Sequence, residues 1–163
     1  MKEIICRDIY AKEYKTNASS LIFRPSVYGI LIEKNKILLV RQFKDGFDFP
    51  GGGVEIDETV EEALKREFWE ETGLQVEPVK IIDIKNSFFK FRYKEIFSNS
   101  ILMYYLCRKI SGELSMANFD EYEKEYADMP EWIDIDKIGS IKFYNAIDSP
   151  SLIKKAFDLS KEK

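Results

Sequence analysis

The order of apolar and polar residues predicts a series of β-strands interrupted by one long amphipathic helix. Apolar runs at 27–32 and 37–40 are joined by the polar residues 33–36, which is the pattern of a hairpin of two buried strands. Pro25 is expected to interrupt the strand pattern that begins at Leu21. Later segments with strand-like patterns are 76–84, 100–108 and 131–136.

The helical pattern is strongest just after a run of glycines. The helix is expected to begin between Glu58 and Val60 and to end near Thr72, with Gly73 as its C-terminal cap. At about 100° per residue, its apolar residues fall on one stripe. The stripe consists of Val60, Ala63, Leu64 and Phe68.

The acids of this helix lie on an unusual face. Glu67 and Glu71 point into the middle of the apolar stripe and Glu70 lies at its edge, whereas solvated glutamates belong on the opposite face. Carboxylates on a half-buried face cost free energy unless positive charge offsets them, and Arg66 supplies only one charge. A divalent cation is therefore expected among them. The competing interpretation is a salt-bridged helix on a binding module.

Two further segments follow. Ser149 is expected to cap a C-terminal helix that has Pro150 at its first position and ends near Leu159. The segment 118–130 is acidic and is predicted to be a loop or a brief helix with a mostly solvated surface.

Composition limits the class of protein. The 163 residues include 45% hydrophobic and 33% charged residues, which is typical of one soluble globular domain, here 1–163. The net charge of −4 makes nucleic acid an unlikely partner. The longest apolar run, 101–107, is too short to span a membrane, and the N-terminus does not resemble a secretory signal. A cytoplasmic location is therefore expected, and the sequence leaves a homodimer open.

The absence of histidine restricts the chemistry. With no histidine in the chain, Ser-His-Asp and Cys-His catalysis and His-ligated zinc are excluded. A general base must be a carboxylate, lysine, tyrosine, cysteine or metal-bound hydroxide. A catalytic metal must be held mainly by oxygen, which favours Mg²⁺ or Mn²⁺.

The stretch 51–74 resembles the signature of the Nudix hydrolase (MutT-like) family. That pattern is a glycine, five residues, Glu, seven residues, then Arg-Glu-apolar-any-Glu-Glu-any-Gly-apolar, and every fixed position is filled here. Phe68 is a mild departure, since the family more often has an aliphatic residue there. The matching residues are Gly52, Glu58, Arg66, Glu67, Phe68, Glu70, Glu71, Gly73 and Leu74.

The resemblance implies a fold and a metal site. The order of elements already suggests an α+β protein, and the family implies an α/β/α sandwich with a mixed β-sheet. It also implies that Glu67, Glu70 and Glu71, with a carbonyl near Gly51, bind Mg²⁺ or Mn²⁺. Glu67 can in addition orient or deprotonate the attacking water, while Arg66 holds the acids in place.

The family commonly takes one further ligand or base from the part of the chain that here is 118–130. The spacing does not identify the residue. Glu121, Glu123 and Glu125 are candidates, and Glu125 is slightly favoured.

Residues flanking the glycines are candidates for substrate binding. Arg41 and Phe49 lie in the segment that leads into the glycine run, although core packing is the simpler interpretation for its phenylalanines. The aromatic and basic segment 86–99 is either an ordinary hairpin or a platform where a ring stacks on a nucleobase. Tyr93 lies where some Nudix members that act on dinucleoside polyphosphates have a tyrosine.

These observations predict a metal-dependent pyrophosphohydrolase that acts on a small-molecule nucleotide substrate. The substrate would be a nucleoside triphosphate, a nucleotide sugar or a dinucleoside polyphosphate. ADP-ribose ranks lower, because the proline that its group often carries about fifteen residues beyond the motif is absent here. The alternatives are an RNA 5′-end pyrophosphohydrolase and a non-catalytic nucleotide-sensing domain.

Overall fold

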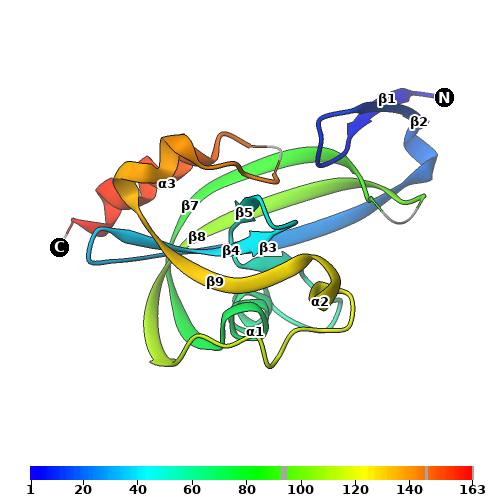
Figure 1. The fold of residues 1–163 in the computed structure, drawn as a ribbon. Coiled ribbons are helices and arrows are strands. Elements are labelled where there is room, and N and C mark those ends of the chain that lie inside the picture. Colours follow the sequence, from blue (N-terminus) through cyan, green and yellow to red (C-terminus); the bar gives the residue numbers. More distant parts are fainter. Residues whose placement is uncertain (93–94, 146, 163) are drawn as a thin grey trace.

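A computed structural model describes residues 1–92, 95–145 and 147–162. Within these ranges one mixed β-sheet lies between two helices, α1 and α3, which cover its opposite faces (Figure 1). The helices are η1 (Ala18–Ser20), α1 (Val60–Thr72), α2 (Glu123–Tyr126), η2 (Ile135–Ser140) and α3 (Ser149–Ser160). The strands are β1 (Glu3–Arg7), β2 (Glu13–Asn17), β3 (Leu21–Glu33), β4 (Lys36–Gln42), β5 (Gly46–Asp48), β6 (Gly51–Gly53), β7 (Leu74–Lys90), β8 (Phe97–Gly112) and β9 (Ala127–Asp134).

The sheet combines parallel and antiparallel pairs. Its order is β2-β1-β7-β8-β3-β4-β5, with β6 pairing to β3 and β9 to β4. The β3–β8 and β1–β7 pairs are parallel, and the remaining pairs are antiparallel. The expected mixed sheet in an α/β/α sandwich is thereby confirmed. The expected hairpin is also present, because Ile32 pairs with Ile37 across a turn in which Lys34 and Asn35 both have positive φ.

Each face of the sheet has its own apolar cluster. On one face, Leu152 and Ile153 of α3 pack on residues of the central strands such as Ile30. On the other face, Leu64 and Phe68 of α1 pack on residues of β3, β4, β7 and β8. These two layers bury the apolar stripes of both helices and fix the position of α1 against the sheet.

Two expectations about proline and capping were wrong. β3 runs through Pro25 without interruption. The Pro25 carbonyl accepts a hydrogen bond from Val54 N–H, so its missing amide hydrogen lies on the β6 side, where strand pairing starts only at Ser26. The N-cap of α3 is Asp148 rather than Ser149, because the Asp148 side chain accepts from Ser151 N–H.

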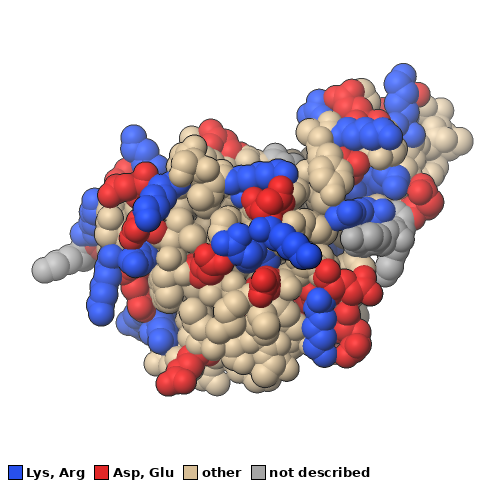
Figure 2. Space-filling model, viewed as in Figure 1, with Lys and Arg blue, Asp and Glu red and all other residues tan. Residues whose placement is uncertain are grey.

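The surface carries mixed charge. The β1–β2 hairpin projects from one end of the sheet, at the opposite end from the C-terminus (Figure 1). Lys and Arg side chains are interspersed with Asp and Glu side chains over the face shown in Figure 2. Among the described residues, no helix is both long enough and apolar enough to cross a membrane.

Candidate active site

Helix α1 is fixed at both ends by local sequence. Thr59 Oγ1 accepts from Glu62 N–H at 3.2 Å, and Glu62 Oε2 accepts from Thr59 N–H at 2.7 Å. This capping box satisfies amide groups that have no partner within the helix. At the other end Gly73 has φ 77°, a left-handed conformation that glycine adopts without strain. The predicted bounds of the helix are therefore confirmed.

The glycine strand β6 lies directly against the acidic face of α1. Gly51 N–H donates to Glu71 Oε2 at 2.8 Å. A Cβ on Gly52 would lie 2.5 Å from Glu67 Oε1, so a larger residue would displace that carboxylate. Gly51 has φ 152°, and a Cβ there would collide with the backbone of Val27. The glycines therefore allow the backbone to approach the acids closely.

Arg66 is the cation that holds this face of α1 together. Its Nη2 lies 2.5 Å from Glu58 Oε1, and its Nη1 lies 2.9 Å from Glu67 Oε1 and 3.2 Å from Glu70 Oε2. Nη2 also donates to the Gly53 carbonyl at 3.2 Å. The hydrogen bonds to Glu58 are the main reason that the pKa of Arg66 is raised. One guanidinium therefore fixes three carboxylates and ties α1 to the glycine strand.

Three carboxylates converge beside Arg66. One oxygen from each of Glu67, Glu71 and Glu123 lies within 4.8 Å of the others, and we call this group the carboxylate trio. Burial raises the pKa of Glu67 to about 7, and burial also raises the pKa of Glu71 and of Glu123. Glu71 is only 7% exposed and receives its one hydrogen bond from Gly51. The ionised trio therefore has too little positive charge among the described residues to be stable alone.

The donor set of the trio fits a hard divalent cation. Mg²⁺, Mn²⁺ and Ca²⁺ prefer oxygen ligands, and metal–oxygen distances are about 2.1 to 2.4 Å. Oxygens on opposite sides of one such ion are about 4 to 5 Å apart. The trio oxygens lie within 4.8 Å of one another, an upper bound compatible with oxygens that share one ion, so the three side chains are candidates to hold a single ion.

Two connected cavities adjoin the trio. The outer cavity, of about 530 Å³, is lined by the acids together with Arg66 and Arg92. The inner cavity, of about 220 Å³, reaches toward Tyr28, Phe49 and Tyr104. They share walls, and a ligand can therefore extend from the acids into the aromatic interior. The residues that line both are Ile9, Arg24, Gly51, Gly52, Glu71, Phe89, Phe91 and Tyr126.

Comparison with known proteins identifies the family. The family model described as "NUDIX domain" matches residues 22–155, which is most of the chain. The chain belongs to the Nudix family. The resemblance predicted from 51–74 is thereby confirmed.

Named relatives share parts of this Nudix chain. An ADP-ribose pyrophosphatase of Methanocaldococcus jannaschii is 37% identical over 108 residues, which cover 64% of this chain and 61% of that protein. An RNA pyrophosphohydrolase of Pseudomonas fluorescens is 40% identical over 73 residues, 43% of this chain and 45% of that protein. The matched stretches thus span less than two thirds of both relatives.

Solved structures support the fold. The crystal structure of an ADP-ribose pyrophosphatase from Streptococcus suis superimposes with a TM-score of 0.64 at 19% identity. The superposition covers 86% of this chain and 93% of that one. At this level of identity the likeness establishes the Nudix fold alone.

Only some of the predicted acidic residues lie in the carboxylate trio. Glu67 and Glu71 join the trio, whereas Glu70 lines the outer cavity with its carboxylate on Arg66 and its side chain 32% exposed. Glu125, the slightly favoured candidate from the acidic segment, is exposed, and the described lining of neither cavity includes it. From the acidic segment it is Glu123, rather than Glu125, that lies with Glu67 and Glu71.

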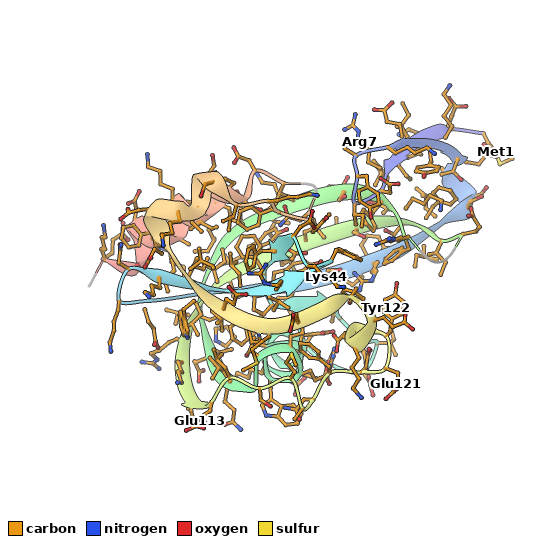
Figure 3. The ribbon with its side chains drawn as sticks, in the orientation of Figure 1. Met1, Arg7, Lys44, Glu113, Glu121 and Tyr122 are labelled. Carbon is orange, nitrogen blue, oxygen red and sulfur yellow. The ribbon has the colours of Figure 1, made fainter. Side chains whose placement is uncertain are left out.

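The geometry of α2 explains why Glu123 rather than Glu125 lies beside Glu67 and Glu71. Residues two apart on a helix are rotated by about 200°, so Glu123 and Glu125 point to opposite sides. Glu123 is also fixed by Asp120, since Asp120 N–H donates to Glu123 Oε2 and Glu123 N–H donates to Asp120 Oδ1. The spacing Asp120-x-x-Glu123 is that of a capping box, and this pattern in the sequence could have favoured Glu123 over Glu125. Figure 3 shows Glu121 and Tyr122 beside α2, just before the helix begins at Glu123.

The predicted substrate-binding residues have different positions. Arg41 does not line either cavity as described; its Nε lies 2.5 Å from Glu131 Oε1, and its guanidinium lies over the ring of Phe47. Arg41 therefore joins β4 to β9. Phe49 lines the inner cavity and is also buried in the core, at 2% exposure. Tyr93 lies outside the described residues.

Sequence reasoning missed the polar residues of the inner cavity. Arg24, Asp48 and Asn145 come from three separated segments, and no spacing in the sequence connects them. Asp48 gave one weak signal, as an acid within the aromatic run 47–49. Their grouping depends on how β3, β5 and the segment before α3 meet.

Proposed function

We propose that this Nudix chain is a divalent-metal-dependent pyrophosphohydrolase that cleaves a phosphoanhydride in a derivative of a nucleoside diphosphate. The convergence of Glu67, Glu71 and Glu123 within 4.8 Å carries the proposal, because it assembles oxygen ligands where burial disfavours their charge. The absence of histidine in the chain leaves oxygen as the main ligand type.

The trio would hold Mg²⁺ or Mn²⁺. Glu70 and the carbonyl of Gly51 are further oxygen donors that we assign to the same site, since both residues line the outer cavity. When bound, such an ion neutralises phosphate oxygens and makes water a better nucleophile.

The protein side chains would position the substrate and the acids. Arg66 keeps Glu67 and Glu70 in fixed orientations through its ion pairs. Glu67 is the carboxylate we assign to orienting the attacking water, because burial brings its pKa to about 7, near the range in which a base is effective.

Arg24 is the group we assign to a substrate phosphate. It lines both cavities, and its Nη1 donates to Ser26 Oγ at 2.6 Å. Among the described residues no carboxylate forms an ion pair with it, so its charge is available at the junction of the cavities. A guanidinium is well suited to phosphate oxygens because of its fork of donors.

ADP-ribose is the first substrate to test. The Methanocaldococcus jannaschii relative carries this substrate in its name, and this observation outweighs the missing proline that had lowered its rank. The RNA alternative has the support of the Pseudomonas fluorescens relative. It is disfavoured by Lys90, which is only 9% exposed and pairs with Glu95. Arg92 lies over the rings of Tyr10 and Phe43 and also lines the outer cavity. The sensing alternative is disfavoured by the assembled trio.

A substrate panel tests the proposal. ADP-ribose, GTP, UDP-glucose, diadenosine tetraphosphate and a 5′-triphosphorylated oligoribonucleotide are incubated with Mg²⁺, Mn²⁺ or EDTA, and released phosphate, pyrophosphate and nucleotide are quantified. We expect turnover only with a divalent ion, and a loss of at least about a hundredfold in kcat/KM for Glu71→Gln. Equal turnover in EDTA, or full activity of a folded Glu71→Gln variant, would contradict the proposal.

A further inference from the structure

The inner cavity has aromatic walls. The rings of Tyr28 and Tyr104 stack with centroids 5.3 Å apart and 21° between their planes, and Phe49 meets Tyr104 edge-on at 5.7 Å. All three side chains line the cavity, whose volume is about 220 Å³. Aromatic side chains favour ligands with π faces, because a nucleobase of any kind can stack on them.

One carboxylate is placed among these rings. Asp48 Oδ1 accepts from Phe49 N–H at 2.8 Å and from Asn145 Nδ2 at 2.9 Å. Within the described residues neither a donor to Oδ2 nor a cation paired with Asp48 is found. Burial raises the pKa of this carboxyl to about 7.

The unpaired oxygen must be reachable from the cavity. In the described part of the chain, no fully buried side-chain oxygen or nitrogen lacks a hydrogen-bond partner. Oδ2 of Asp48 has no partner among the described residues, so it is not fully buried, and Asp48 lines the inner cavity. When Asp48 is ionised, Oδ2 therefore offers one acceptor to a ligand there, while Oδ1 is already engaged by two donors.

A donor lies next to this acceptor. Ser149 Oγ–H donates to Asn145 Oδ1 at 2.8 Å, which fixes the amide so that Nδ2 faces Asp48. The second hydrogen of Nδ2 remains for a ligand, because an amide nitrogen carries two. The cavity thus presents an acceptor and a donor side by side.

We infer that the inner cavity binds the adenine of the substrate, with its 6-amino group donating to Asp48 Oδ2 and an adjacent ring nitrogen accepting from Asn145 Nδ2. This inference rests on the proposed function, in which ADP-ribose is the first substrate. Adenine offers an amino donor beside a ring-nitrogen acceptor, which matches the pair that the cavity presents. The phosphates then extend past Arg24 to the trio.

The charges of the cavity set this direction. Asp48 belongs to the described lining of the inner cavity and not to that of the outer one, so an anionic group is repelled from the inner end. Arg24 lies at the junction with the outer cavity, where it favours phosphate. Turning the base over to exchange its donor and acceptor would also move its ribose to the other side of the ring.

A pair of nucleotides tests the inference in the wild-type protein. AMP and IMP differ by the exchange of the 6-amino donor for an oxo acceptor, with a hydrogen added at N1. Their affinities are measured by isothermal titration calorimetry with Mg²⁺ and again with EDTA. We expect AMP to bind at least about tenfold more tightly in both conditions, because an unmatched buried acceptor is costly. Equal binding, or tighter binding of IMP, overturns the inference.

Asp48→Asn replaces one hydrogen-bond acceptor of the inner cavity with a donor. The new amide oxygen can keep the Oδ1 contacts to Phe49 and Asn145, while its NH₂ group replaces the Oδ2 acceptor with a donor. We expect the preference for AMP to disappear or to reverse toward IMP. Asp136→Asn, the same substitution at an exposed site in η2, is the matched control and should keep the wild-type preference. A thermal melt of each variant confirms that it is folded.

The two proposals fail in distinguishable ways. Binding of AMP and IMP requires no turnover, so a protein without hydrolytic activity can still show the preference and its loss in Asp48→Asn. A protein with metal-dependent turnover that binds AMP and IMP equally would refute the adenine assignment alone.

Discussion

Helices α1 and α3 cover opposite faces of one sheet, and they bury different chemistry. On α3 the buried residues are Leu152, Ile153 and Ala156, with Ser149 at its start. On α1 a similar apolar set is accompanied by Glu71, which is buried, and Glu67, which is half-buried. Both helices have a side-chain N-cap, so their ends are stabilised in the same manner.

The difference separates stability from function. Burying an apolar side chain stabilises the fold, whereas burying an ionised carboxylate costs free energy unless a positive charge is near. α3 therefore needs no explanation beyond packing. We propose that a ligand supplies positive charge to the acids of α1, and this is why α1 rather than α3 carries the candidate site.

Core deletion on α3 should give the largest change in stability. Leu152→Ala is expected to lower the free energy of unfolding by about 2 to 3 kcal/mol, since it removes buried methyl groups and leaves a cavity. Glu71→Gln should leave the free energy of unfolding in EDTA unchanged or higher, because it removes a buried charge. Urea denaturation measures both. The comparison fails if Glu71→Gln destabilises the chelated protein as much as Leu152→Ala does.

The acids of α2 extend the comparison to metal affinity. Glu123→Gln is expected to weaken binding of Mg²⁺ or Mn²⁺ by about tenfold, because affinity follows the number of charged ligands. Glu125→Gln makes the same chemical change on the exposed side of α2 and should shift the affinity by less than about twofold. The metal affinity of each variant is measured by calorimetric titration. An equal loss of affinity in both variants would reject the assignment of Glu123.

The pH dependence of stability gives the smallest and most specific effect. Burial raises the pKa of Glu67 to about 7 and raises the pKa of Glu71, so the folded state binds protons more tightly than the unfolded state. Their contribution to stability is complete below their ordinary pKa values. The part due to Glu67 is lost as the pH rises through about 7, and the part due to Glu71 is lost as the pH rises through its own raised pKa.

Thermal melts at pH 5 and pH 8 measure this effect. In EDTA the Tm is expected to fall between these values, and Mg²⁺ should restore it at pH 8 more than at pH 5, because the ion binds the ionised trio. Glu67→Gln should reduce both changes. A Tm that is independent of pH, or an equal effect of Mg²⁺ at both pH values, would contradict the proposed link between the raised pKa values and metal binding.

Local pattern was sufficient for much of the fold. The bounds of α1 followed from its periodicity and from Gly73, and the β3–β4 hairpin followed from two apolar runs and a polar turn. Pro25 shows the limit of such reasoning. The residue breaks a strand only where its missing amide hydrogen is needed, and that depends on the neighbouring strand β6.

The candidate site also has features that follow from local sequence and features that depend on the tertiary structure. The sequence by itself determined the Nudix motif and the inward direction of Glu67 and Glu71, and it led us to expect an oxygen-bound metal, because helical geometry and composition act over short distances. Only the tertiary structure decided that Glu123 completes the trio, that Arg41 pairs with Glu131, and that Asp48 faces an aromatic cavity. Those contacts join residues far apart in the chain, and their burial, which sets their charge and chemistry, exists only once the sheet has brought them together.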